Sequence, residues 1–247
     1  MINKALILAA GFGSRLLDYT EDKPKSLISI KGKPILEYQL DALTANGVDK
    51  IIIVIGYKGE KIREFIQNSK FKNLNIKFIE NKEFASSESS YSFWLARDEI
   101  MHEPYIHLNC DVIFSKELVK ALIENENENV IVIDEKVRLL EGKMEHVILN
   151  DGRIIKMDKE KVRNPTGKGA GIAKFSPDNI KWLIEKIDRY VTDGDKGQNF
   201  YTFIRDGIHF KNFYGILSEN NFIKEVNTVE ELQEISKVIE EIERNVQ

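Results

Sequence analysis

A glycine-containing segment near the start of the chain carries residue types that bind phosphate groups. It reads Leu8-Ala-Ala-Gly-Phe-Gly-Ser-Arg-Leu16 and begins at the end of an apolar run. Glycines after a buried strand let the backbone approach a ligand and direct N–H groups toward phosphate oxygens. Arg15 and Lys25 add positive charge, Arg15 as a planar fork and Lys25 as a point charge. The small side chains of Ala9 and Ala10 leave room for a base or ribose. The segment predicts a binding site for a phosphorylated ligand.

Two familiar phosphate loops are excluded by spacing. The segment lacks the third glycine of a dinucleotide fingerprint, and Gly-x-x-x-x-Gly-Lys-[Ser/Thr] occurs nowhere in the chain. A lone Gly-x-Gly also fits a plain strand-to-helix turn beside surface cations, so the glycines alone do not decide the chemistry.

A carboxylate follows another apolar run, in Leu108-Asn-Cys-Asp-Val-Ile-Phe114. An aspartate at a strand end is a natural ligand for Mg²⁺, which prefers a few carboxylates together with phosphate oxygens. Taken alone, Asp111 also fits a cap for the following helix. Cys110, the single cysteine, is expected to be a small buried hydrophobe, and one cysteine excludes both an internal disulfide framework and a Cys-rich zinc site.

Short apolar runs alternating with helical patterns must position these residues. The expected strands are Lys4–Ala10, Lys50–Gly56, Asn75–Glu80, Tyr105–Asn109 and Asn129–Asp134, and the expected helices are Pro34–Leu43, Gly59–Asn68, Ser90–Met101 and Lys116–Asn125. This alternation predicts a parallel sheet covered on both sides, with ligands bound at the carboxyl ends of its strands. Later patterns predict a hairpin over His146–Lys156, a strand over Gly169–Phe175, and helices over Asp178–Asp193, Phe200–Asp206 and Glu230–Arg244.

Taken together, the glycine segment and the later Pro24-Lys-Ser-Leu27 resemble the signature of nucleotidyltransferases that join a nucleoside triphosphate to a phosphorylated small molecule. The family pattern is Leu-Ala-Ala-Gly-x-Gly-x-Arg-Leu followed by Pro-Lys-[Ser/Ala/Pro]-Leu, and both halves occur here in order. The resemblance runs from Lys4 to about Ile239 and is weakest between Lys136 and Lys168. It implies the α/β nucleotide-diphospho-sugar transferase fold, a Rossmann-like, mostly parallel sheet flanked by helices with a small hairpin subregion for the acceptor. We expect one domain over residues 1–247, with a nucleotide-binding half (about 1–115) and an acceptor- and metal-binding half (about 116–247).

The resemblance also implies the site residues. Arg15, Lys25 and Asp111 receive catalytic roles. Tyr91-Ser-Phe-Trp-Leu-Ala96 is similar to the segment that closes a base-recognition loop in members with small non-sugar acceptors. The expected nucleotide contacts are Leu8, Ala9, Ala10, Gly11, Phe12, Gly13, Ser14, Arg15, Lys25, Asn81, Ser89, Ser90 and Asp111.

One position departs from the family pattern. Lys224-Glu-Val-Asn-Thr-Val-Glu-Glu-Leu232 matches a segment that usually reads Glu-Ile-Asp-[Thr/Ser], whose aspartate is the second metal ligand. Here Asn227 takes that place, so the Mg²⁺ site is expected to consist of Asp111 and Asn227 with one negative charge missing. Glu225 is a candidate to offset the loss. Thr228 and Glu231 predict a capping box for the terminal helix.

The resemblance implies attack by an anionic acceptor oxygen on the α-phosphorus, with release of pyrophosphate and no need for a general base. Short members with this loop resemble cytidylyltransferases, which favours CTP. Their acceptors include phosphocholine, 2-aminoethylphosphonate, inositol phosphate and phosphorylated amino-acid amides, in cell-surface polysaccharide or phosphonate biosynthesis. Lys159, Tyr91 and Glu225 are the expected acceptor contacts. A cationic acceptor could also be bound by aromatic faces and carboxylates. The candidates are Trp182, Tyr190, Phe200, Tyr201, Glu88 and Glu135.

Two alternative functions stay open. One is a sugar-1-phosphate nucleotidyltransferase using UTP, dTTP or GTP, and the other is a nucleotide-sensing subunit of weak activity.

Composition limits the other partners. The 247 residues hold 36 Lys and Arg against 40 Asp and Glu, a formal charge of −4, which excludes a strongly basic nucleic-acid-coating surface. No apolar run approaches the roughly 18–20 residues of a membrane span. We therefore expect a cytoplasmic monomer or homodimer that binds neither nucleic acid nor membrane. The four histidines show no metal or triad spacing and receive no role.

Overall fold

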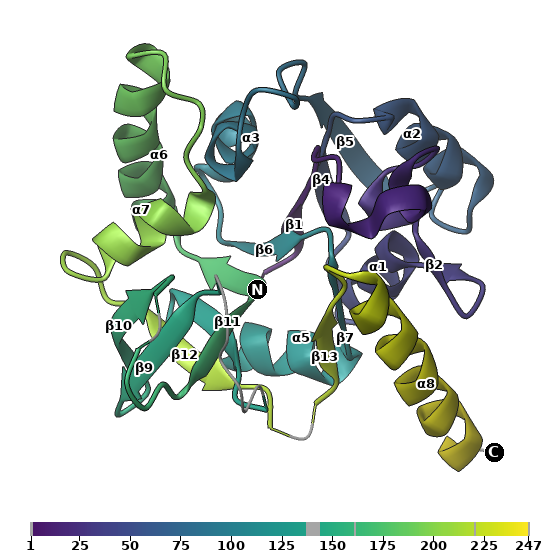
Figure 1. Ribbon diagram of the computed structural model, residues 1–247. Helices are drawn as coiled ribbons and strands as arrows, with labels where there is room; N and C mark the ends of the chain where they lie inside the picture. The colour runs from purple at the N-terminus through teal and green to yellow at the C-terminus, as the bar shows by residue number, and fades with distance from the viewer. Residues whose placement is uncertain (1, 137–143, 161, 220, 247) are drawn as a thin grey trace.

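A nine-stranded sheet organises the chain in the computed structural model, which describes residues 2–136, 144–160, 162–219 and 221–246 (Figure 1). Its strand order is β5-β4-β1-β6-β11-β8-β12-β10-β9. Part of the segment where the family resemblance is weakest, residues 137–143 and 161, lies outside the described residues. No helix among the described residues is both long and apolar enough to cross a membrane.

The first half of the sheet is parallel, as the alternation of strands and helices predicts. It contains β1 (Lys4–Ala9), β4 (Lys50–Ile55), β5 (Asn75–Glu80) and β6 (Tyr105–Asn109), which pair in parallel register. The near-continuous aliphatic runs of β1 and β4 suit strands that are covered on both faces.

The second half of the sheet is mixed. The long strand β11 (Gly167–Phe175) runs antiparallel to both β6 and β8 (Val130–Asp134), while β12 (Tyr214–Leu217) runs parallel to β8. The predicted hairpin is confirmed as β9 (His146–Asn150) and β10 (Arg153–Asp158). Positive φ at Asp151 and Gly152 forms its two-residue turn. Antiparallel β11 thus joins the predicted parallel core to the hairpin subregion.

Helices cover the two faces in separate groups (Figure 1). One apolar core contains residues of α1 (Ile35–Thr44), α2 (Gly59–Asn68) and α5 (Lys116–Glu124). The core on the other face contains residues of α3 (Ser89–Leu95), α4 (Arg97–Ile100), α6 (Pro177–Thr192) and α7 (Phe200–Gly207). Both predicted layers are present, although the sequence pattern for Ser90–Met101 divides into two short helices.

Several short elements complete the fold next to the glycine segment. These are the 3₁₀ turns η1 (Ser14–Thr20) and η2 (Lys25–Leu27), the pair β2 (Ser29–Ile30) and β3 (Lys33–Pro34), and the pair β7 (Val112–Phe114) and β13 (Ile223–Glu225). The terminal helix α8 (Val229–Val246) packs Leu232 and Ile235 into a third, smaller core with η1 and β2. Its predicted capping box is confirmed, because the Thr228 hydroxyl accepts from the Glu231 N–H at 3.2 Å and the Glu231 carboxylate accepts from the Thr228 N–H at 3.1 Å.

Candidate active site

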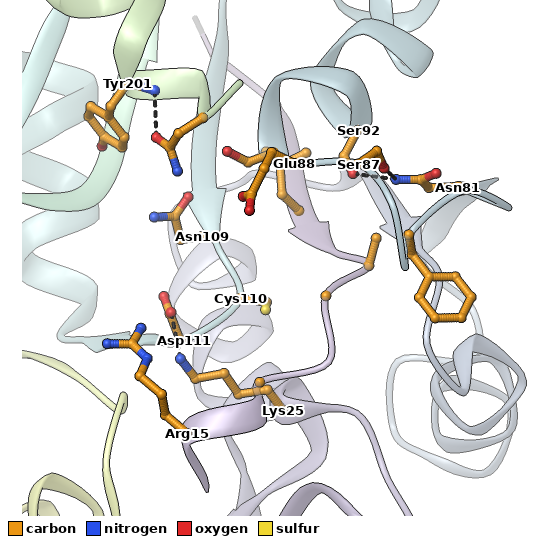
Figure 2. Close-up of a pocket in the computed structure, with 17 residues that line it drawn as sticks. Arg15, Lys25, Asn81, Ser87, Glu88, Ser92, Asn109, Cys110, Asp111 and Tyr201 are labelled. Carbon is orange, nitrogen blue, oxygen red and sulfur yellow. Dashed lines mark hydrogen bonds and ion pairs between the residues drawn. The ribbon is translucent and has the colours of Figure 1, made fainter. Parts of the chain in front are cut away.

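A cavity of about 310 Å³ opens where β1 and β6 end, at the predicted edge of the sheet (Figure 2). Its walls come from the glycine segment, the Lys25 turn, the loop before α3, the turn after β6 and the start of α7. The lining residues are Leu8, Ala10, Gly11, Gly13, Arg15, Lys25, Asn81, Phe84, Ser87, Glu88, Ser89, Ser92, Asn109, Cys110, Asp111, Asn199 and Tyr201. Nine of the residues predicted from the sequence therefore share one cavity.

Gly13 shows why the segment needs glycine. Its φ of 67° lies in the left-handed region, and a Cβ built there would lie 3.0 Å from the Cβ of Lys25. The backbone of the glycine segment therefore lies directly against the Lys25 side chain. A larger residue at this position would push the glycine segment away from the Lys25 side chain.

Arg15 and Lys25 lie beside Asp111 at one end of the cavity (Figure 2), and Asn227 joins them there through hydrogen bonds. The Lys25 ammonium donates to the Asp111 carboxylate at 2.7 Å and to the Asn227 amide oxygen at 3.0 Å. Arg15 donates to the same Asn227 oxygen at 2.8 Å. Lys25 is 7% exposed, so its charge acts where water screens it little. The structure thus brings together residues that the sequence places more than two hundred positions apart, since Arg15 and Asn227 are separated by 212.

Glu225 continues this network away from the cavity. Its carboxylate accepts from the Asn227 amide N–H at 3.1 Å and from the Lys168 ammonium at 3.0 Å. Burial and the nearby Asp111 charge raise the pKa of Glu225, although Lys168 opposes the shift. Asn227 therefore lies between a cationic side, which its oxygen faces, and an anionic side, which its N–H₂ faces. This arrangement defines the amide orientation.

The other end of the cavity is held by side-chain amide and hydroxyl groups. Asn81 donates to the hydroxyls of Ser87 and Ser92, each at 3.0 Å, and its oxygen accepts from the Glu83 N–H at 2.9 Å. The Ser89 hydroxyl accepts from the Phe200 N–H at 2.9 Å. The loop before α3 and the start of α7 are thus joined by a hydrogen bond that orders one wall of the cavity.

Other predicted contacts are not among the residues that line the cavity. Phe12 packs against Tyr57 and Phe84 with ring centroids 4.6 and 5.2 Å apart. Tyr91 donates its hydroxyl to Glu83 at 2.8 Å. The remaining predicted residues outside the lining are Ala9, Ser14, Ser90, Lys159, Glu225 and Asn227. Lys159 follows the end of β10, whereas Lys168 of β11 is the lysine that reaches Glu225.

Several lining residues were not predicted as nucleotide contacts. Phe84, Ser87 and Ser92 lie in the polar segment already singled out, and Asn109 precedes Cys110 and Asp111, so proximity in the sequence was a usable signal. Glu88 and Tyr201 were named only as possible partners of a cationic acceptor. Asn199 had no signal, because it is brought to the site by the packing of α7. Cys110 lines the cavity and is half-buried, whereas a buried side chain was predicted; burial raises the pKa of its thiol to about 12.

Comparison with known proteins identifies the family. The MobA-like NTP transferase domain matches residues 5–159, which include the glycine segment, Lys25 and Asp111. The chain belongs to this family. It is a nucleotidyltransferase, as the paired motifs predicted.

Curated relatives include cytidylyltransferases and guanylyltransferases. CTP:phosphoglutamine cytidylyltransferase of Campylobacter jejuni is 29% identical, with 80% of this chain and 84% of the relative covered. Choline-phosphate cytidylyltransferase of Haemophilus influenzae is 30% identical, with 76% of each chain covered. Mannose-1-phosphate guanylyltransferase 1 of Arabidopsis thaliana is 31% identical, with 78% of this chain and 54% of the relative covered. The relatives support nucleotidyl transfer and leave the acceptor open.

Solved structures confirm the predicted fold class. The inositol-1-phosphate CTP transferase of T. maritima superimposes with a TM-score of 0.82 at 20% identity, covering 98% of this chain and 96% of that one. The CTP:phosphocholine cytidylyltransferase of Streptococcus pneumoniae gives a TM-score of 0.77 at 21% identity, with 97% of this chain and 100% of that one covered. These matches extend over both halves of the chain.

Proposed function

We propose that this nucleotidyltransferase transfers CMP from CTP to a small acceptor that carries a phosphate or phosphonate group, releasing pyrophosphate. The observation that supports this most directly is the convergence of Arg15, Lys25, Asp111 and Asn227 at one end of the cavity. The choice of CTP is supported by the relatives in Campylobacter and Haemophilus, whose names state cytidylyl transfer.

The chain's own residues would act by positioning and by neutralising charge. Amides of the glycine segment and Arg15 would hold the β- and γ-phosphates, while Lys25 would contact the α-phosphate. The attacking oxygen is already anionic, so no side chain has to remove a proton. What the site must overcome is the repulsion between two polyanions brought into line. Loss of one preorganised electrostatic contact typically costs about 10²–10³ in rate.

The residues present fit a magnesium ion. Lys25 places a positive charge between the Asp111 carboxylate and the Asn227 amide oxygen, which shows that these two oxygens converge on a cation. Among the described residues no group of three or more His, Cys, Asp or Glu could hold a metal. Mg²⁺ commonly takes only one or two protein oxygens together with substrate phosphates. Asp111 and Asn227 would hold Mg²⁺. When bound there, the ion would supply positive charge that neutralises the phosphate groups.

The acceptor end of the site is proposed to lie beside Glu225, in the second half of the chain. Glu225 remains a candidate acceptor contact through its place next to Asn227. Lys159 and Tyr91 remain candidates from the family resemblance, and neither side chain is among the residues that line the cavity. A role in cell-surface polysaccharide or phosphonate biosynthesis belongs to the same proposal.

Two other functions are favoured by specific observations. A sugar-1-phosphate nucleotidyltransferase using UTP, dTTP or GTP is favoured by the guanylyltransferase relative in Arabidopsis. A nucleotide-sensing subunit is favoured by Asn227, which lacks the negative charge expected of the second metal ligand. Intact Arg15, Lys25 and Asp111 count against the sensor.

A pyrophosphate-release screen tests the proposal. Four triphosphates would each be combined with phosphocholine, 2-aminoethylphosphonate, inositol phosphate and sugar 1-phosphates. We expect turnover with CTP and one small phospho-acceptor. Turnover with UTP, dTTP or GTP and a sugar phosphate would replace the proposal by the first alternative. Nucleotide binding without turnover on any acceptor would identify the sensor.

Variants of the cationic end test the residue roles in the same assay. Lys25→Ala and Asp111→Ala should each reduce turnover by about 10²–10³ while the far-ultraviolet circular dichroism stays unchanged. Lys116→Ala, which changes a lysine whose side chain is 67% exposed, serves as the control and should leave turnover intact. Near-normal pyrophosphate release by either site variant would refute the assignment.

A further inference from the structure

The turn that presents Asp111 is held from behind by a buried glutamine. Gln39 lies in α1 and is 0% exposed. Its side-chain N–H₂ donates to the carbonyl of Asn109 at 2.8 Å and to the carbonyl of Val112 at 2.8 Å. These two carbonyls flank Cys110 and Asp111, the two residues between β6 and β7. One amide group thus bonds to both ends of the turn.

The orientation of the Gln39 amide is determined by its surroundings. The reversed amide would aim its oxygen at two carbonyl oxygens, which is repulsive. In the observed orientation the Gln39 oxygen has no hydrogen-bond partner among the described residues. A buried acceptor without a partner carries a cost. The two hydrogen bonds from the Gln39 N–H₂ to the turn outweigh this cost. They therefore determine the placement of the Gln39 side chain.

The same turn is held on two further sides. The Asp111 carbonyl accepts from the Val226 N–H at 2.8 Å, which ties it to the residue before Asn227. Gly171 of β11 packs against it so closely that a Cβ there would lie 2.9 Å from the Asn109 amide nitrogen and 2.9 Å from a Val112 methyl. These backbone contacts fix the position of Asp111 relative to Asn227. The Gln39 side chain adds two hydrogen bonds to the same turn.

We propose that Gln39 is a positioning residue, which fixes the β6–β7 turn so that the Asp111 carboxylate stays in register with Asn227 and Lys25. The effect on catalysis rests on the proposed function, whereas the effect on the turn does not. Helix α1 is suited to this role because it follows the Lys25 turn closely, with the Ile35 N–H donating to Ile28 and the Ile28 N–H to Lys25. Gln39 thereby links the elements that carry Lys25 and Asp111.

Gln39→Met tests the proposal, because methionine has a similar length and no donor. Tyr38→Phe is the matched control, since it removes a hydroxyl of the same helix that donates to the Ile30 carbonyl at 3.1 Å, and Ile30 belongs to β2. Hydrogen exchange measured by mass spectrometry follows the amides of Asn109–Phe114 and of Val226. We expect exchange there to become about tenfold faster or more in Gln39→Met, with other β-strands unchanged and Tyr38→Phe like the parent.

Turnover gives the second readout. In Gln39→Met the Mg²⁺ concentration for half-maximal rate should rise about tenfold, with a smaller change in the KM for the nucleotide. Gln39→Asn keeps the amide on a side chain one methylene shorter; it should show a partial effect and serves if Gln39→Met fails to fold. Unchanged exchange at the turn overturns the proposal, as does fast exchange with normal Mg²⁺ dependence or a uniform loss of protection over the chain. A chain that turns over no substrate would still show the exchange difference, so failure of the proposed function is separately visible.

Discussion

The Asn227 side chain is where this site departs from its family pattern, and its surroundings show how the departure is accommodated. Its oxygen faces Lys25 and Arg15 while its N–H₂ faces Glu225. An aspartate could reproduce only the first of these contacts. In place of the N–H₂ it would set a second carboxylate against Glu225, and two like charges at that distance repel. Asn227 and Glu225 therefore form a matched pair.

Asn227→Asp should have two opposite effects. Added negative charge should strengthen Mg²⁺ binding, whereas repulsion with Glu225 should lower the free energy of unfolding without metal by about 1–2 kcal/mol. Isothermal titration with Mg²⁺ and CTP measures the first, and urea unfolding in chelator measures the second. The double variant Asn227→Asp, Glu225→Gln should recover the lost stability. A metal affinity that does not rise, together with lost activity, would show that Asn227 is not a ligand.

His107 gives the molecule a pH dependence that is separate from the site. It lies in β6, stacked on Phe200 with ring centroids 4.3 Å apart, and burial lowers its pKa from 6.5 to about 3. Below pH 6.5 the His107 imidazole binds a proton in the unfolded chain, whereas in the folded chain it stays neutral. The free energy of unfolding should therefore fall as the pH drops from 6.5 toward 3, by about 1.4 kcal/mol per pH unit from this group.

His107→Phe isolates that contribution. Urea unfolding of parent and variant from about pH 7 to about pH 5 should show the parent losing stability faster, because carboxylates act equally in both chains. The difference between the two free energies should change by about 1.4 kcal/mol per pH unit below pH 6.5. Parallel pH curves would show that His107 titrates normally in the folded state.

At the scale of elements, what the sequence could predict depended on element length and on periodicity. Long apolar runs and amphipathic helices gave bounds within a residue or two, including α2 and β5 as predicted. The pairs β2–β3 and β7–β13 were not predicted, because strands of two or three residues show no periodicity. The sequence also could not predict that β11 runs antiparallel to its neighbours, because an apolar run fits a strand in either direction.

The candidate site divides in the same way. Residues that follow β1 and β6 could be placed from the sequence because parallel strands share a carboxyl edge. Asn199 and Lys168 could not, because tertiary packing of α7 and β11 brings them there. In the sequence, Gln39 is simply one residue of a predicted amphipathic helix. Its contact with the β6–β7 turn could not be predicted, because it depends on how that helix packs in the fold.

The junction between α3 and α7 makes one wall of the cavity from two distant elements. Besides the Ser89 to Phe200 bond, the Ser90 N–H donates to Gln198 at 3.2 Å and the Glu88 N–H donates to Lys196 at 2.8 Å. Ser89→Ala removes one of these bonds and should raise the KM for the nucleotide by about 3–10-fold at nearly constant kcat. Ser86→Ala, which alters an exposed serine of the same loop, is the control. Steady-state kinetics with varied nucleotide checks this, and an equal fall in kcat would place Ser89 at the reacting groups instead.

For the whole molecule, the sheet joins the two expected halves into one structure. One core contains Ala5 and Ile53 from the first half together with Val130, Ile172 and Ile223 from the second. The core on the opposite face mixes both halves as well, for example Leu6 with Phe175. Neither half can keep its apolar surface buried if the other unfolds. The nucleotide site therefore depends on the integrity of the complete sheet, although Arg15, Lys25 and Asp111 all belong to the first half.

Nucleotide binding in the cavity should consequently raise the free energy of unfolding of the entire chain. A nucleotide at about one hundred times its Kd adds about 2.7 kcal/mol, which for a domain of this size raises Tm by about 5–10 °C. Differential scanning calorimetry with and without CTP and Mg²⁺ should show one transition that moves as a unit, and Lys25→Ala should reduce the shift. Two transitions, of which only one moves with nucleotide, would mean that residues of about 1–115 fold independently. A single moving transition is what shared cores on both faces of one sheet require.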